Sequence, residues 1–263
     1  MTGTMALFPR PLCPRRRLPE DETLRREVHL MINVRRKDSI YHKEGGWFSA
    51  NWHFSFDEYY DPGNMGFGTL RVFNDDRLVP GAIWPMHPHR DIEGLTYVVE
   101  GTFRHQDSLG NGGVLPAGSV QRMTLGSGAY HSEQNGSETE PLHFIQMWIM
   151  PETRGLPPSV EQKVFTKEDR TNRLLEAIGP EGTPGAVKVH RDASVYVSHL
   201  EASAGVELAL ADGYGAYLFV IEGEVDLNGQ GLAAGDAALA WDEERLAISA
   251  RQPSELILVR VEV

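Results

Sequence analysis

The sequence predicts an all-β protein built from two similar antiparallel units, each closed or sandwiched. From Trp47 onward, short runs of alternating apolar and polar residues are separated by turn residues, which is the pattern of strands and hairpins. Two segments of the first half recur in the second half, which indicates two units of one design. With 263 residues and 41% hydrophobic content, the chain is long enough to fill a sizeable core.

The first 30 residues are expected to lie outside the folded body, which begins near Met31. Four arginines stand among several prolines before Glu20. That composition is compatible with a transit peptide or a basic tail, but a disordered extension, or translation begun upstream of a natural start near Met31, is the simpler interpretation. Residues 20–30 are acidic first and basic later, which suits a short helix.

The first unit is predicted as a succession of short strands. The segment Asn74-Asp75-Asp76 and a glycine-rich segment at residues 110–113 are expected to form turns between them. The runs that we expect to form strands lie at residues 52–56, 68–73, 96–104, 120–123 and 143–149.

A proline-rich segment from Pro151 to Pro158 is the predicted linker, because it cannot continue a central strand. Residues 31–155 are therefore assigned to an N-terminal unit and residues 156–263 to a C-terminal unit. Residues 167–178 have acids early and three apolar residues on one side, so they are predicted to form one moderate helix. Strands resume after it.

The internal repeat decides which unit can carry histidine chemistry. Residues 97–103 match residues 218–225, and residues 115–118 match residues 232–235. No histidine lies beyond His199. Only the first unit can therefore hold a metal site made of histidines.

Four of the ten histidines lie within residues 81–135, and three of them, His87, His89 and His131, stand next to other side chains that can bind a metal. His87 and His89 are two positions apart, so on a strand they share a face, about 6 to 7 Å apart at their roots, and can lean onto one ion. His131 and Glu133 repeat this spacing on a second strand. If the two strands face each other, the four side chains form one N₃O metal site.

The motifs around these residues resemble those of the cupin β-barrels and, more closely, of the pirin family. Residues 81–93 read Gly-x₅-His-x-His-x₃-Glu, and residues 118–135 read Gly-x₅-Thr-x-Gly-x₄-His-x₃-Asn. The second motif departs from the usual cupin pattern, with Thr124 in place of proline and four residues rather than two after Gly126. The resemblance to pirins spans roughly residues 31–263, and it is carried by residues 53–56, 70–76, 87–90, 100–101, 105–111, 120–123 and 131–135.

The resemblance implies two tandem antiparallel cupin β-barrels, a bicupin, with one mononuclear metal in the N-terminal barrel. Carried over to this chain, it implies the ligands His87, His89, His131 and Glu133. The second half resembles the bacterial quercetinase-type pirins, which implies a flavonol 2,3-dioxygenase that uses Fe(II) and O₂, with Glu133 also acting as general base. Mn, Co, Ni, Cu or Zn would fit the same ligands. The alternative is a metal-dependent, redox-sensing regulatory protein that binds a partner protein.

Other polar side chains compete for a place at the site. Glu93 is six residues from His87 and four from His89, so on a strand it could face the same site and rivals Glu133 as the carboxylate ligand. Otherwise it is a group behind the ligands or a salt-bridged wall residue. His105 and His143 lie in predicted strands, where ordinary hydrogen bonds are the expected role. His53 precedes an aromatic run and is a candidate for lining the pocket.

Composition narrows the classes of partner. A formal net charge of −12 disfavours direct binding to nucleic acid. The single Cys13 excludes an internal disulfide framework and a thiolate metal cluster, and it agrees with a reducing compartment, so we expect a cytoplasmic protein. No run approaches the ~20 apolar residues that a membrane helix needs. We expect a monomer whose partners are a small flavonol and O₂.

Overall fold

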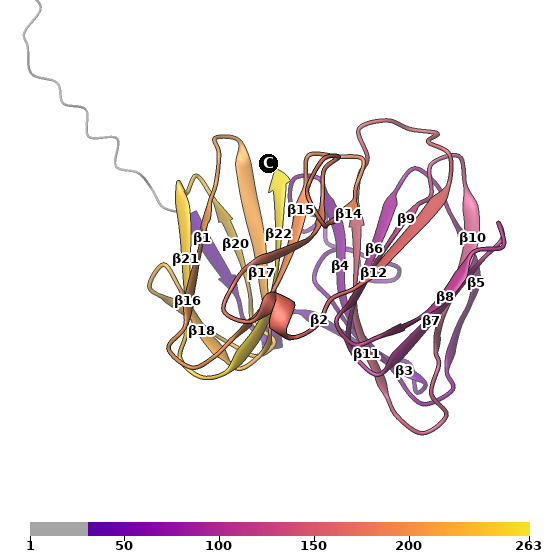
Figure 1. Ribbon diagram of the computed structural model, residues 1–263, viewed down its shortest axis with the longest axis horizontal. Coiled ribbons are helices and arrows are strands. Elements are labelled where there is room, and N and C mark those ends of the chain that lie inside the picture. Colours follow the sequence, from indigo (N-terminus) through magenta and orange to yellow (C-terminus); the bar gives the residue numbers. More distant parts are fainter. Residues whose placement is uncertain (1–30) are drawn as a thin grey trace, which may run out of the picture.

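The computed structural model describes residues 31–263, which form an all-β protein with two units side by side (Figure 1). The prediction of a short helix over residues 20–30 lies outside this part of the chain. Within residues 31–263, the only helical segments are two 3-10 turns, η1 (Lys37–Ser39) and η2 (Glu168–Arg170). The strands form four sheets, two of seven strands and two of four strands. The all-β prediction with two tandem units is confirmed.

The first unit packs a seven-stranded sheet against a four-stranded sheet. The order of the larger sheet is β12-β9-β6-β11-β4-β3-β2, and that of the smaller sheet is β5-β10-β7-β8. Their strands are β2 (Tyr41–Glu44), β3 (Phe48–Trp52), β4 (Leu70–Leu78), β5 (Ile83–His89), β6 (Glu93–Glu100), β7 (Thr102–Asp107), β8 (Gly112–Pro116), β9 (Ser119–Thr124), β10 (Ala129–Asn135), β11 (Leu142–Ile149) and β12 (Ser159–Val164).

The second unit repeats this arrangement. Its larger sheet has the order β1-β20-β17-β22-β15-β13-β14, and its smaller sheet has the order β16-β21-β18-β19. Their strands are β1 (Met31–Arg35), β13 (Leu175–Gly179), β14 (Val187–Lys188), β15 (Ser194–Leu200), β16 (Gly205–Ala209), β17 (Tyr214–Glu222), β18 (Glu224–Leu227), β19 (Gln230–Ala233), β20 (Ala237–Trp241), β21 (Arg245–Ala250) and β22 (Ser254–Glu262).

The repeated sequence forms equivalent turns in the two units. Gly101 joins β6 to β7 and Gly223 joins β17 to β18, with φ of +85° and +87°. A Cβ at Gly101 would collide with the carbonyl oxygen of Pro141, and one at Gly223 would meet that of Pro253 in the same way. Both positions need glycine for its backbone conformation and for the close approach of another strand.

The largest apolar core lies between the two units rather than inside either of them. It joins buried side chains of both seven-stranded sheets, such as Phe73 and Ile145 from the first and Tyr217 and Ile257 from the second. Alternate residues of β4 and β11 face this core, and the residues between them face the interior of the first unit. These two strands therefore separate the inter-unit core from that interior.

Strand pairing crosses the predicted boundary at residues 155 and 156. β12 follows the predicted linker but pairs with β9 of the first unit, and β1 lies within the range predicted for the first unit but pairs with β20 of the second. Each of these strands extends an edge of a sheet in the other unit and so covers the strand that would otherwise be exposed there. The boundary itself stays a prediction.

Three sequence predictions of local structure are wrong. Residues 52–56 do not form a strand: β3 ends at Trp52, and Phe56 makes only an isolated bridge with Tyr59. Residues 167–178 do not form a helix: Asp169 accepts hydrogen bonds from Thr166 across the short turn η2, and the segment then becomes strand β13. Ala177 and Ile178 are fully buried in the inter-unit core, and this burial outweighs the weak helical pattern. Asn74-Asp75-Asp76 is not a turn but the buried middle of β4, where Asn51 and His143 hydrogen-bond the Asp75 carboxylate.

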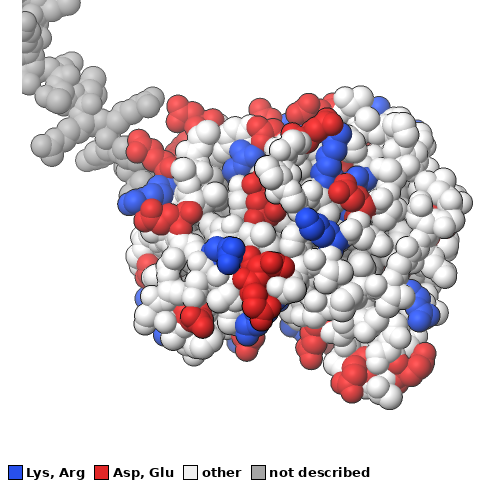
Figure 2. Space-filling view, in the orientation of Figure 1, with Lys and Arg blue, Asp and Glu red and all other residues white. Residues whose placement is uncertain are grey.

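Charged side chains on the surface are mixed in sign. On the face shown in Figure 2, acidic and basic side chains lie interspersed, and uncharged surface covers much of the first unit. Within the described residues, no helix is both long and apolar enough to span a membrane.

Candidate metal centre

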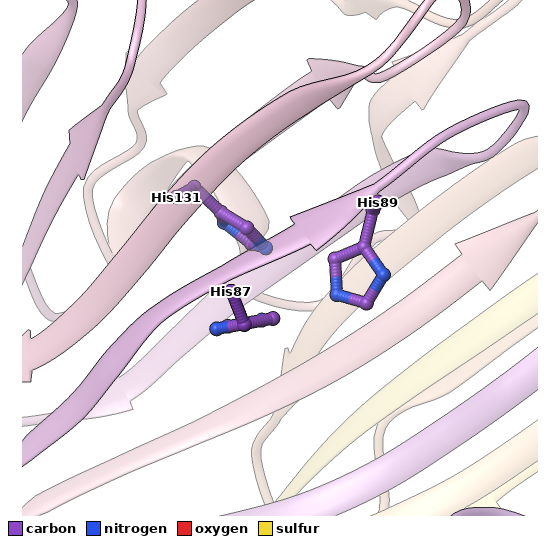
Figure 3. A group of neighbouring side chains, drawn as sticks. All are labelled: His87, His89 and His131. Atoms are coloured by element: carbon purple, nitrogen blue, oxygen red, sulfur yellow. The ribbon is translucent and has the colours of Figure 1, made fainter.

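Two neighbouring strands bring the predicted histidines together. His87 and His89 lie on β5, His131 lies on β10, and the strands pair so that His131 is opposite His87 (Figure 3). Ala129 is the partner of His89 across the pair, and its small side chain leaves room for the imidazole. A register shift between His131 and Glu133 alters the pairing just beyond the cluster.

The three imidazoles are close enough to share one ion. Their ring centroids lie 4.5 to 5.2 Å apart. One nitrogen from each ring can be chosen so that all three lie within 4.8 Å of one another. A divalent ion bound at about 2.0–2.2 Å by imidazole nitrogens needs separations of this order after small rotations of the rings.

Hydrogen bonding leaves one ring nitrogen of His87 and both ring nitrogens of His131 available to bind a metal. His87 Nδ1 lies 2.8 Å from the carbonyl oxygen of Pro85, to which it can donate, so Nε2 keeps its lone pair for a ligand. His131 is buried, yet neither of its ring nitrogens has a hydrogen-bond partner among the described residues. Buried polar atoms are rarely left in this condition, so the donor set fits a metal ion.

Glu133 lies beside these histidines on β10. One of its carboxylate oxygens is 3.2 Å from His131 Nδ1, and the other is 4.0 Å from His87 Nε2. The side chain is 9% exposed. The structure therefore brings together all four residues that the sequence predicts as ligands.

Burial disfavours the charged forms of His89, His131 and Glu133. Burial, followed by the charges of His87, His89 and His105, lowers the pKa of His131 to about 2. Burial and the neighbouring His87 lower the pKa of His89 to about 4. Burial raises the pKa of Glu133 to about 8. His89 and His131 are therefore neutral imidazoles at neutral pH, which is the form that binds metals.

A pocket of about 360 Å³ opens beside the cluster. Its aromatic walls come from Phe56, Trp84, Phe144 and Trp148, and His89 packs edge-on against Trp148 at 4.7 Å between ring centroids. Its polar wall consists of Asn74, Asp76 and Gln146, and Glu133, His87 and His89 also line the pocket. An oxygen of Asn74 and one of Asp76 are buried without a hydrogen-bond partner among the described residues. The pocket suits a flat, hydroxylated molecule.

The sequence did not single out this polar wall, because Asn74 and Asp76 were assigned to a turn. The sequence of β11 did carry an indication of the pocket. Phe144, Gln146 and Trp148 occupy alternate positions of this strand, so they share the face that lines the pocket.

Glu93 lies away from the histidine cluster. It is fully buried, 3.0 Å from His190 Nδ1 and 3.8 Å from Arg122 Nε, so it is the salt-bridged residue that the sequence left open as an alternative. His105 does not join the ligand group, and its Nε2 lies 3.0 Å from the sulfur of Met123. His143 pairs with Asp75, as the expected hydrogen-bonding role requires, and His53 bonds the hydroxyl of Tyr217.

Comparisons with known proteins cover most of the chain. The family model for pirin matches residues 33–149, and that for the quercetinase C-terminal cupin domain matches residues 177–261. A quercetin 2,3-dioxygenase of Escherichia coli K12 is 41% identical over 229 residues, which are 87% of this chain and 97% of that protein. The chain belongs to the pirin family.

Other pirins agree with this assignment. A pirin-like protein of Caulobacter vibrioides is 41% identical over 230 residues, which are 87% of this chain and 99% of that protein. The crystal structure of a bacterial pirin from Escherichia coli in complex with nickel(II) has a TM-score of 0.83 at 39% identity, and the match covers 88% of this chain and 99% of that one. The family and bicupin fold predicted from the sequence are confirmed.

Proposed function

We propose that this protein is a metal-dependent dioxygenase that cleaves a flavonol such as quercetin. The observation that carries the proposal is the convergence of three imidazoles and a buried carboxylate at one end of a pocket with aromatic walls. The names of the bacterial relatives support the substrate class. His87, His89, His131 and Glu133 would hold the metal.

When bound, a divalent metal supplies Lewis-acid activation of a chelating substrate and access to one-electron chemistry with O₂. Fe(II) is the proposed ion, and Mn, Co, Ni, Cu or Zn would suit the same ligands; the related pirin from Escherichia coli was crystallised in complex with nickel(II). The predictions of a cytoplasmic monomer that binds no nucleic acid directly stay predictions.

The protein's own side chains position the substrate and move a proton. Trp84 and Trp148 offer flat apolar faces for the ring system. The polar wall of Asn74 and Asp76 can hydrogen-bond the substrate's hydroxyl groups, which fixes its orientation. Glu133 faces the same space and can accept the proton of the 3-hydroxyl, leaving an electron-rich enolate for reaction with O₂.

The test compares His131→Ala with His199→Gln, a control in the second unit. The first variant should lose bound metal and oxygen uptake on quercetin together, whereas the control should keep both. Elemental analysis measures the metal, and an oxygen electrode measures turnover. A fully metal-loaded protein that leaves a panel of flavonols untouched would contradict the proposal. If such protein instead captures a partner in a manner that depends on metal oxidation, the redox-sensing regulatory alternative is favoured.

A further inference from the structure

A second cavity, of about 430 Å³, lies between the two units. It shares no lining residue with the pocket at the histidine cluster. Asp75, Arg77 and His143 line it from the faces of β4 and β11 that point away from the first unit's interior. The second unit contributes Phe219, Ile221, Ala234 and Gly235. The two cavities therefore lie on opposite faces of the same strands.

The buried acid of this cavity is already neutralised by its neighbours. Asp75 lies 2.5 Å from His143 Nε2, and it accepts hydrogen bonds from Asn51 at 3.0 Å and Arg77 at 3.1 Å. It therefore has little capacity left to attract a cation. The other acid on the lining, Asp38, is exposed to solvent, which screens its charge.

His53 brings an unused hydrogen-bond donor to the cavity. Its Nδ1 lies 2.6 Å from the Tyr217 hydroxyl, and burial lowers the pKa of His53 to about 3, so the ring is neutral. Burial raises the pKa of Tyr217, and the positive charge of Arg35 opposes that rise. The Tyr217 hydroxyl can donate its proton to His53 Nδ1. In that arrangement the His53 proton is on Nε2, which is buried without a partner among the described residues.

Two positively charged side chains, Arg77 and Lys37, add further hydrogen-bond donors to the lining. The Arg77 guanidinium is partly occupied by Asp75, while its side chain is 46% exposed along the cavity. Lys37 forms no ion pair within the described residues, and its stem lies against Gly235, where a Cβ would be 3.1 Å from that of Lys37. The apolar part of the lining consists of Ile40, Phe219 and Ile221.

We propose that the cavity between the units is a binding site for a small aromatic carboxylate. Arg77, Lys37 and the His53 imidazole would surround the carboxylate group, and the ring would lie against Phe219 and Ile221. Such a ligand matches the excess of donors and the apolar wall, and the volume lies within the range of small-molecule sites, about 300–1,000 Å³. The inference does not depend on the metal or on the proposed dioxygenase activity.

The experiment titrates full-length protein with benzoate by calorimetry and uses benzamide as an uncharged probe of the same shape. Benzoate should bind saturably in the millimolar range or tighter, and benzamide about tenfold or more weakly. Arg77→Gln should weaken benzoate binding about tenfold. Arg104→Gln is the matched control, because it removes the same charge from an exposed position on β7 and should leave binding unchanged.

Two further variants locate the site. Ala234→Trp places a large side chain on an exposed residue of the lining, so it should block binding with little risk to folding. His131→Ala should leave benzoate binding intact, because it alters only the metal centre. The proposal is overturned if benzoate does not bind, if benzamide binds equally well, or if binding survives Ala234→Trp but is lost in His131→Ala.

Discussion

Replacement of Glu133 by glutamine is predicted to stabilise the metal-free protein while weakening its hold on metal. The side chain keeps its shape but loses a carboxylate that burial disfavours in its charged form. Without a metal ion, the neutral imidazoles of His89 and His131 offer Glu133 no positive charge. The carboxylate that the metal site requires therefore destabilises the folded protein when no metal is bound.

The size of the effect follows from proton linkage. Glu133 has a folded pKa of about 8 against the ordinary glutamate value of 4.5, so between these values the folded protein holds a proton that the unfolded chain has released. Wild-type stability accordingly falls as the pH rises through this window, and the cost is complete only above the folded pKa. From pH 5 to pH 8 the loss amounts to about 3 kcal/mol, at about 1.36 kcal/mol per pKa unit.

The assay is urea unfolding of EDTA-treated wild type, Glu133→Gln and Glu138→Gln at pH 5 and pH 8. Glu138 is exposed, so its variant controls for the loss of one negative charge. Glu133→Gln should gain about 3 kcal/mol over the wild type at pH 8 but little at pH 5, and the control should follow the wild type. Added metal should reverse the order by stabilising the wild type more. Equal stability of the two proteins at pH 8 would refute the view of a desolvated carboxylate.

Three more predictions concern the neighbouring strands. Asp76→Leu should weaken flavonol binding about tenfold in a fluorescence titration without changing metal content, and unaltered affinity would remove Asp76 from the polar wall. Ile145→Ala, in the inter-unit core, should cost about 3 kcal/mol in a single urea transition, whereas two separate transitions would show that the units unfold independently. Burial opposes ionisation of Asp75, but the hydrogen bond and charge of His143 hold its pKa below the usual range. This stabilisation is present above the unfolded pKa of about 3.9 and is lost as the pH falls, so His143→Gln should unfold at a higher pH in an acid titration followed by circular dichroism.

The sequence predicted the elements that depend on local spacing. The i, i+2 pattern placed His87 and His89 on one face, and the internal repeat predicted two units of one design. Sequence-based prediction failed where contacts between residues far apart in the chain determine the structure. Asp75 can occupy a buried strand only because His143 solvates it, and no local signal reveals that partner.

The same reason explains the error about residues 167–178 and decides between the two roles that the sequence left open for Glu93. Parity allowed Glu93 to face the metal centre, but its actual partners are Arg122 on β9 and His190 from the second half of the chain. The apolar side chains of residues 174–178 suited a helix, yet the inter-unit core took them as a strand. In both cases the contact between the units decides the structure, and a single unit's sequence does not contain it.

The packing of the two units also accounts for the position of the site. The interior of the second unit is filled by a large cluster of aliphatic side chains, including Leu218, Leu227, Leu246 and Ile248. The first unit has two smaller clusters instead, on either side of the histidines and the pocket. The seven-stranded sheet of the first unit buries apolar side chains on its other face, the one that packs against the second unit. Polar residues such as Asn74 and Asp76 can therefore line a cavity inside the first unit, because the second unit supplies the stability that this cavity removes.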